Sequence, residues 1–168
     1  MSEEKYSPLS IIGSTEYVEI AGVKNVPAKI DTGADTSAVW ATDIDMKKDG
    51  TLVFSLFGSK SPFYTGERLE SKDYVVKVVR SSHGDQQLRY RVRLPLKIGK
   101  KMLETTFTLA NRSRNHFPIL VGRHTLEGNF VVDVSKSAIE RKSAEHSKKL
   151  NQELRKDPYK FHQKYVNK

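Results

Sequence analysis

Apolar residues recur in short alternating runs between residues 11 and 110, a pattern typical of β-strands. Strands are expected at residues 17–20, 52–57, 74–79, 88–96 and 102–110. In the fourth of these, Leu88, Tyr90, Val92, Leu94 and Leu96 share one face, and Arg89, Arg91 and Arg93 share the other. Residues 22–25 predict a turn, and residues 58–66, which contain Ser, Pro and Gly, predict a loop.

Strands 74–79 and 88–96 flank the segment Arg80-Ser81-Ser82-His83-Gly84-Asp85, which is a compact turn signal. Together they predict a long β-hairpin with its tip near His83 and Gly84. Such a hairpin is either an ordinary surface hairpin or a flap that closes over a substrate and excludes water.

Helices are expected only late in the chain. A short helix is predicted at 123–126 and ends at Gly128, and a longer one runs from Ser137 to about Lys156, before Asp157-Pro158. Few apolar residues occur in the longer segment, so a solvated or partly disordered tail is the simplest interpretation.

Residues 31–37, Asp-Thr-Gly-Ala-Asp-Thr-Ser, follow a short apolar stretch and place a carboxylate at a strand end. Asp31 can be one of two carboxylates that share a proton and a water, one acting as base and the other as acid. The Thr32 hydroxyl can bond to backbone across such a site, and Gly33 lets the loop approach a peptide without a Cβ. Alone, an Asp-x-Gly triplet is also an ordinary turn.

A second element, Ile119-Leu120-Val121-Gly122-Arg123, changes this picture. With Asp31-Thr32-Gly33-Ala34 it resembles the retropepsins, in which such an apolar–Gly strand packs beneath the catalytic loop. The resemblance implies an ion pair within the subunit between Asp35 and Arg123. More narrowly, residues 29–34, 80–84 and 120–123 resemble a RimK-related bacterial family of retropepsin-like aspartic proteases, usually labelled "ATP-dependent zinc protease". That family typically carries Arg at the position of Asp35.

The resemblance covers roughly residues 10–135 and implies an all-β fold. The expected architecture is a closed acid-protease barrel of six or seven strands, with a short helix after the apolar–Gly strand. Residues 136–168 are expected to form a basic helical C-terminal tail. Because the chain holds one such Asp loop, it supplies half a site, and a homodimer is expected to pair two Asp31 carboxylates. Residues 129–134 lie where retropepsins use terminal strands to join subunits.

Candidate site residues follow from the same resemblance. Asp31 is the expected catalytic residue, supported by Thr32, Gly33, Ala34, Asp35 and Arg123. Ser81, Ser82, His83 and Gly84 are the expected flap, and Leu120, Val121 and Gly122 the expected substrate pocket. Asp35 and Arg123 could instead be unrelated surface charges, and His83 is a turn residue more readily than a metal ligand.

Sequence motifs of metal-dependent, nucleotide-dependent and serine or cysteine hydrolases do not occur in the chain. The 168 residues include no cysteine, and the five histidines form no H-E-x-x-H or other ligand spacing. No G-x-x-x-x-G-K-[ST] loop or G-x-S-x-G elbow occurs. We therefore expect no metal and no cofactor. No apolar run approaches 18 residues and no signal peptide is evident, so a cytoplasmic protein is expected.

The net charge of +9 raises the question of which molecules the protein binds. Nucleic-acid binding is disfavoured because no zinc-finger, helix-turn-helix or RNP-like signal accompanies the charge. If the apolar face of strand 88–96 packs on the barrel, Arg89, Arg91 and Arg93 turn outward, toward solvent or an approaching chain. These arginines are either surface charges without a specific role, or they attract acidic peptides such as glutamate-rich tails.

The expected function is a homodimeric aspartic endopeptidase. The alternative is a non-catalytic peptide- or partner-binding module that regulates a glutamate ligase.

Overall fold

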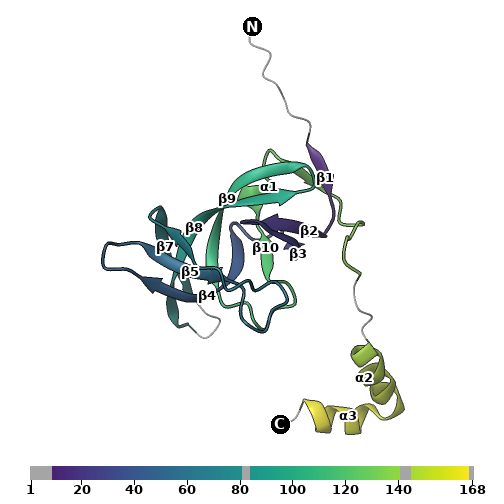
Figure 1. The fold of residues 1–168 in the computed structure, drawn as a ribbon. Coiled ribbons are helices and arrows are strands. Elements are labelled where there is room, and N and C mark those ends of the chain that lie inside the picture. Colours follow the sequence, from purple (N-terminus) through teal and green to yellow (C-terminus); the bar gives the residue numbers. More distant parts are fainter. Residues whose placement is uncertain (1–8, 81–83, 141–144, 167–168) are drawn as a thin grey trace.

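The computed structural model describes residues 9–80, 84–140 and 145–166 (Figure 1). The strands are β1 (Ser10–Ile12), β2 (Thr15–Ile20), β3 (Val23–Ile30), β4 (Ser37–Met46), β5 (Leu52–Leu56), β6 (Leu69–Ser71), β7 (Tyr74–Arg80), β8 (Gln86–Ile98), β9 (Lys101–Ala110), β10 (Ile119–Val121) and β11 (Phe130–Val132). The helices are α1 (Arg123–Leu126), α2 (Glu145–Lys156) and α3 (Pro158–Tyr165).

Six of these strands close into a barrel, which confirms the expected all-β fold with a closed barrel. The order is β10-β3-β2-β8-β9-β4, and β4 pairs back to β10. The β3–β10 and β4–β9 pairs are parallel, whereas the β10–β4 pair is antiparallel. β3 and β10 therefore run side by side in the same direction and end together, which brings the Asp31 and Gly122 loops to one edge.

Alternating side chains explain why the barrel closes around one core. Along β8, Val92, Leu94 and Leu96 of the predicted apolar face are buried, and so is Ile98, whereas Leu88 is 69% exposed. The apolar face therefore packs on the barrel only from Val92 onward, because the first half of β8 leaves the barrel in a hairpin with β7. One predicted turn is wrong: it occupies residues 21–22, and β3 already begins at Val23.

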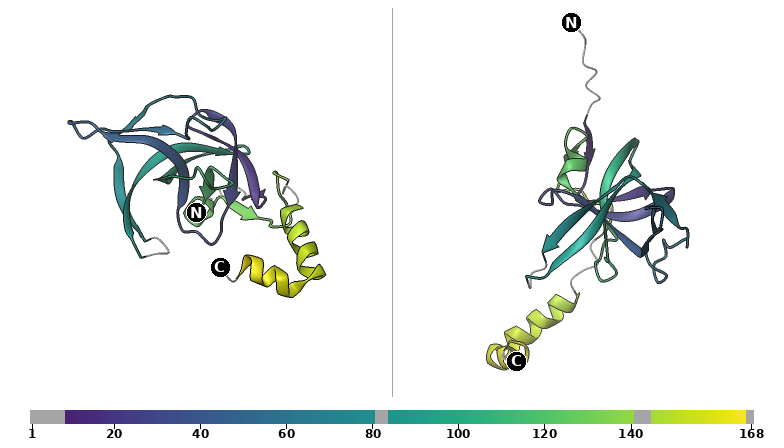
Figure 2. Two further views of the ribbon diagram at one scale, coloured as in Figure 1. Left: turned by 90° about the horizontal axis from the view of Figure 1, so that it is seen from below. Right: turned by 90° about the vertical axis from the view of Figure 1, so that its left-hand side faces the viewer.

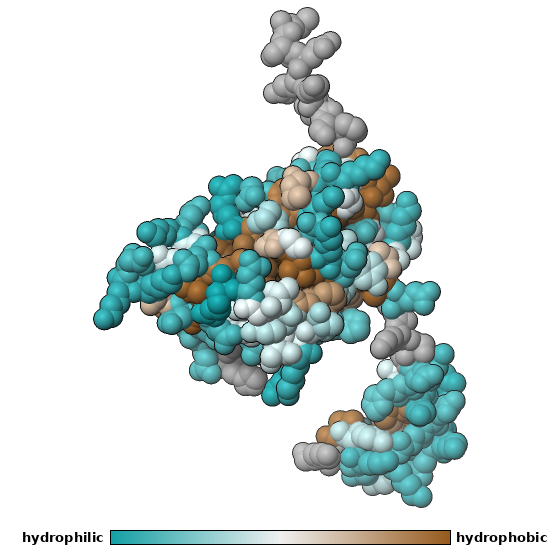
Figure 3. Space-filling model, viewed as in Figure 1, coloured by the Kyte–Doolittle hydropathy of each residue, from teal (hydrophilic) through white to brown (hydrophobic). Residues whose placement is uncertain are grey.

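The predicted terminal strand pairs inside its own chain. β11 lies parallel to β1 in a separate two-stranded sheet, with Ile11 opposite Val131. Both of these side chains are exposed, at 62% and 47%. Apolar surface is visible around β1 in Figure 3.

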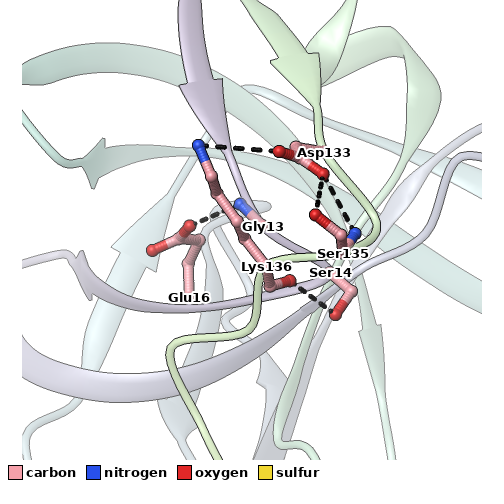
Figure 4. Close-up of polar contacts among 6 residues, drawn as sticks. All are labelled: Gly13, Ser14, Glu16, Asp133, Ser135 and Lys136. Atoms are coloured by element: carbon pink, nitrogen blue, oxygen red, sulfur yellow. Dashed lines mark hydrogen bonds and ion pairs between the residues drawn. The ribbon is translucent and has the colours of Figure 1, made fainter.

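The segment after β11 folds back onto the loop between β1 and β2 (Figure 4). The Ser14 hydroxyl donates to the Lys136 carbonyl at 3.0 Å, and the Ser14 N–H donates to the same carbonyl at 2.8 Å. A Cβ on Gly13 would come within 2.6 Å of this carbonyl oxygen, so the close approach requires glycine. Asp133 accepts bonds from the Ser135 N–H and hydroxyl, which lower the pKa of the Asp133 carboxyl.

The predicted helix from Ser137 to Lys156 is wrong at its start. Residues 137–140 are not helical, because the Ala138 N–H donates to the Thr15 carbonyl and the Ile139 N–H to the Thr15 hydroxyl. α2 ends at Lys156 as expected, but Asp157 then caps a further helix, α3. Neither α2 nor α3 contains a buried residue, and Figure 2 shows the pair outside the barrel. Among the described helices, none has the length and apolar character needed to cross a membrane.

Candidate active site

Asp31 lies at the end of β3, where its N–H continues the parallel ladder by donating to the Val121 carbonyl at 2.9 Å. Its side chain is 28% exposed. Oδ1 accepts the Gly33 N–H at 3.1 Å, and Oδ2 lies 3.9 Å from the Lys29 ammonium. Within the described ranges the carboxylate accepts one backbone hydrogen bond and makes one ion pair, and its remaining lone pairs can accept bonds from water or a substrate.

The loop carrying Asp31 is braced by the start of α1. The Arg123 N–H donates to the Ala34 carbonyl at 2.7 Å, and the His124 N–H donates to the Asp35 carbonyl at 3.1 Å. The predicted ion pair between the Arg123 guanidinium and the Asp35 carboxylate is present. Both side chains are largely exposed, so the backbone bonds contribute more to the brace than the charges do.

Gly122 is required where the two loops cross. A Cβ at this position would lie 2.5 Å from the Thr36 carbonyl carbon, which no side-chain rotation could relieve. The Gly122 N–H donates to the Ser37 hydroxyl at 3.0 Å, and this hydroxyl lies 2.7 Å from the Thr125 hydroxyl. No sequence pattern singled out Ser37 or Thr125 as a site residue, although each lies within three residues of a predicted one.

The expected pocket residues point to different sides of β10. Leu120 is partly buried and lies opposite Lys29 and Ala38 on the neighbouring strands. Val121 was expected to form a pocket wall, but its side chain is fully buried in the hydrophobic core. This correction follows from strand alternation, since only one of two consecutive side chains can face the site.

One row of residues crosses five strands beside the site. It consists of Lys29, Leu120, Ala38, Thr108 and Arg91, each opposite the next across a strand pair. Opposite residues point to the same face of a sheet. Their neighbours along the strands, including Ile30, Val121, Val39 and Val92, are buried in the core. The row therefore lies on the face opposite the core, which also carries Asp31.

Arg112, just beyond β9, is a site residue that the sequence did not suggest. It is partly buried and donates its Nε–H to the Phe117 carbonyl at 3.0 Å. Burial lowers the pKa of the Arg112 guanidinium, the Arg89 charge lowers it further, and Asp31 opposes both effects. Arg89 and Arg91 are themselves partly buried, and Arg89 interacts electrostatically with Arg112, whereas Arg93 is exposed, so only Arg93 turns fully outward as expected.

The described residues include only part of the predicted flap. Gly84 has a backbone φ of +87° with no atom near a would-be Cβ, as a hairpin turn requires. Ser81, Ser82 and His83 lie outside the described residues. The β7–β8 hairpin is confirmed by its register, whereas its action as a flap stays a prediction.

Metal binding was expected to be absent. The described ranges contain no cluster of three or more His, Cys, Asp or Glu side chains arranged to hold a metal ion. His83 lies outside these ranges, so the expectation stays a prediction.

Comparison with known proteins places these features in a family. Residues 11–143 match the model of the RimB-like family, described as retropepsin-like aspartic endopeptidase RimB. A crystal structure of Lpg0085 from Legionella pneumophila, a protein of unknown function, superposes with a TM-score of 0.60 at 27% identity, covering 76% of this chain and 95% of that one.

Two relatives are named probable alpha-L-glutamate ligases. The Desulfotalea psychrophila ligase is 29% identical over 128 residues, which are 73% of this chain and 28% of the ligase. The Shewanella pealeana ligase is 31% identical over 142 residues, which are 82% of this chain and 30% of the ligase. The chain thus spans less than a third of the length of these relatives. Through its family match and its barrel, the chain belongs to the RimB-like family of retropepsin-like aspartic endopeptidases.

Proposed function

We propose that the protein is a homodimeric aspartic endopeptidase in which Asp31 of each copy supplies one carboxylate of the catalytic dyad. The observation that carries the proposal is the partly exposed Asp31 carboxylate, fixed at the joint ends of β3 and β10. One chain carries one such loop, so the complete dyad requires a second copy. A cysteine-free chain also fits the cytoplasm, where we expect the enzyme to act.

An open groove beside the catalytic loop supports pairing. Thr32 lines it together with Leu126, Phe130 and Val132, and its volume is about 620 Å³. Phe130 and Val132 belong to β11, and the β1–β11 sheet exposes the apolar side chains of Ile11 and Val131. Burial of these apolar groups and of the sheet edge against a second copy would stabilise a dimer.

The expected mechanism uses one charged and one protonated Asp31. The charged carboxylate removes a proton from a water held between the two, and the water oxygen attacks the peptide carbonyl carbon. The protonated carboxyl donates its proton to the carbonyl oxygen, which gives a tetrahedral diol. As the C–N bond breaks, the carboxyl that took the proton from water passes it to the leaving nitrogen, and the other carboxylate takes a proton from one diol hydroxyl. This step releases the new carboxylic acid and restores one charged and one protonated Asp31. The Gly33 N–H bond keeps the Asp31 oxygens in a fixed orientation for these transfers.

The charges near Asp31 favour acidic substrates. The Lys29 ammonium lies 3.9 Å from Asp31 Oδ2, and Arg112 interacts electrostatically with both Asp31 and Arg89. We therefore expect glutamate-rich peptides to be cut faster than neutral ones at low salt. The difference should shrink as salt rises, because the screening length is about 10 Å at 0.1 M. Equal rates that do not respond to salt would remove this substrate class.

The decisive experiment is Asp31→Asn. An amide cannot share the dyad proton, so hydrolysis of a peptide library should fall by on the order of 10³ or more while the fold and the dimer persist. Wild-type turnover per chain should rise with concentration through the monomer–dimer range seen by sedimentation. EDTA should leave activity unchanged. A strictly monomeric active protein, or activity lost to EDTA and restored by zinc, would contradict the proposal.

A second function has its own support. Since the relatives that match are named glutamate ligases, the same barrel could bind a ligase or its peptide without chemistry. In that case Asp31→Asn would leave partner binding intact and no peptide of the library would be cut.

A further inference from the structure

Strand β7 has one edge to which no other strand is paired. Within the described part of the chain it pairs only with β8, and no backbone hydrogen bond joins Tyr74–Arg80 to a loop or another element there. In an antiparallel pair, every second residue directs its N–H and C=O away from the partner strand. The outer side of β7 therefore presents a row of donors and acceptors with which an extended chain can pair.

The residues of β7 favour the addition of a strand at this edge. Four of its seven residues are valine, a β-branched type that suits a pleated surface. Val75, Val76 and Val78 are each more than half exposed. A long, apolar edge strand of this kind is a template for pairing with another chain.

One face of the β7–β8 hairpin is apolar near this edge. Val76 lies opposite Tyr90, and Val78 lies opposite Leu88. Leu88 and both valines are exposed, so this surface is open to a further apolar side chain. A strand beside β7 would place every second side chain on this face, because successive residues of a strand point to opposite sides.

The opposite face of the hairpin is basic. Lys77 on β7 lies directly opposite Arg89 on β8. The Arg89 guanidinium donates to the Gln87 side-chain oxygen at 3.1 Å, which is a neutral acceptor. Neither Lys77 nor Arg89 forms an ion pair within the described ranges. The remaining side chains of an added strand would face these cations, so carboxylates fit there best.

The same charges disfavour a second copy of β7 as the added strand. When two β7 strands pair antiparallel along their full length, residue 77 of one lies opposite residue 77 of the other. The two Lys77 ammonium groups, each with Arg89 beside it, would repel one another. A partner strand with acidic residues at these positions replaces the repulsion by attraction.

We propose that the free edge of β7 docks an extended segment of another protein, which adds a strand to the hairpin and alternates acidic with apolar residues. Main-chain hydrogen bonds supply the affinity, and the two faces of the hairpin supply the specificity. The docked strand pairs with β7 and not with the Asp31 loop, so binding requires neither hydrolysis nor a second copy. The proposal therefore goes beyond the peptidase activity.

Peptide binding to the full-length Asp31→Asn protein tests the dependence on residue order. One fluorescent peptide alternates Glu and Val, and its isomer carries the same residues in two blocks. The alternating peptide should bind about tenfold tighter by anisotropy, because only alternation places every carboxylate on the Lys77 face. N-methylation of one alternate set of peptide residues should abolish binding, and N-methylation of the other set should not, because only one set donates to β7.

The substitution Lys77→Glu should change which peptide binds. The variant should bind the Glu–Val peptide about tenfold more weakly, and it should bind a Lys–Val counterpart more tightly than the unsubstituted protein does. That gain also shows that the variant is folded. Lys72→Glu is the matched control, because Lys72 is exposed between β6 and β7 and lies outside the paired strand. It should leave the preference for alternation unchanged.

Amide exchange locates the docked strand. Alternate amides of β7 should gain protection when the Glu–Val peptide binds, and the amides of β1 and β11 should not. Equal binding of the two isomers, or protection confined to other strands, would overturn the proposal. Protection of the β7 amides that rises with protein concentration in the absence of peptide would assign the edge to a second copy instead.

Discussion

The Asp31 loop and the C-terminal helical pair are held together in opposite ways. In the loop, Asp31 bonds to Val121 and Gly122 bonds to Ser37, so each contact joins residues far apart in the chain. In the tail, the contacts are local: Asp157 caps α3, and Glu153 pairs with Lys164. The loop therefore exists only when the barrel is folded, whereas the tail gains its order from its own sequence.

The substitution Gly122→Ala should destabilise the loop contacts more than any other change considered. The new Cβ would overlap the Thr36 backbone at 2.5–2.6 Å, and two crossing loops would have to separate. We expect a loss of about 2–4 kcal/mol in the free energy of unfolding by urea. Gly33→Ala is the control, because its Cβ would meet only the Asp31 carboxylate oxygen at 3.4 Å. Equal losses in the two variants would show that the crossing is not constrained.

Ser37→Ala should have the next largest effect. It leaves the buried Gly122 N–H and Thr125 hydroxyl without their partner, at a cost of about 1–3 kcal/mol in unfolding free energy. Ser55→Ala is a matched control, because the Ser55 hydroxyl is equally buried and has no partner in the described residues. The control should be neutral or slightly stabilising. A destabilisation of Ser55→Ala as large as that of Ser37→Ala would refute the role of the hydroxyl pair.

Asp157→Ala should affect the tail alone. Asp157 Oδ1 accepts the Lys160 N–H at 3.0 Å at the start of α3, and loss of such a cap costs a helix about 1 kcal/mol. Amide exchange in α3 should rise while the barrel amides keep their protection. Asp157→Asn, which can still cap, should exchange like the wild type. Faster exchange in β3 or β10 would mean that the tail and the barrel are coupled.

The smallest expected effect is on pH dependence at the fold-back segment. Because its bonds to Ser135 lower the pKa of Asp133, the ionised carboxylate stabilises the fold at neutral pH. This contribution is lost as the pH falls through the lowered folded-state pKa. The stability difference between wild type and Asp133→Asn should therefore shrink between pH 7 and pH 3. Ser135→Ala should weaken the same pH dependence, and a difference that grows on acidification would contradict it.

The features that could be predicted from the sequence are those that depend on the identity of single residues or on local patterns. The carboxylate of Asp31 and the close approach of Gly122 depend on residue types that few alternatives can replace, and strand alternation indicated most of the core. The resemblance added the ion pair of Asp35 with Arg123, which no local pattern contains.

The failures come from contacts between distant residues. Ser137 begins a plausible helix, but Thr15 binds the following backbone and holds it extended. The position of Arg112 near Asp31, and the row from Lys29 to Arg91, depend on the strand order of the closed barrel. The pairing of β11 with β1 likewise depends on where the two ends of the domain meet.

The fold-back segment also fixes where the tail begins. Ile139 and Glu140 line a small cavity with Lys29, on the same side of the barrel as Asp31. In a two-fold dimer, two helical pairs would leave from fixed points next to the shared dyad. A partner held by both tails would experience an effective concentration in the millimolar range, so two weak contacts would give tight binding. Dimer formation would then control recruitment by avidity, and dilution would release the partner and disassemble the dyad together.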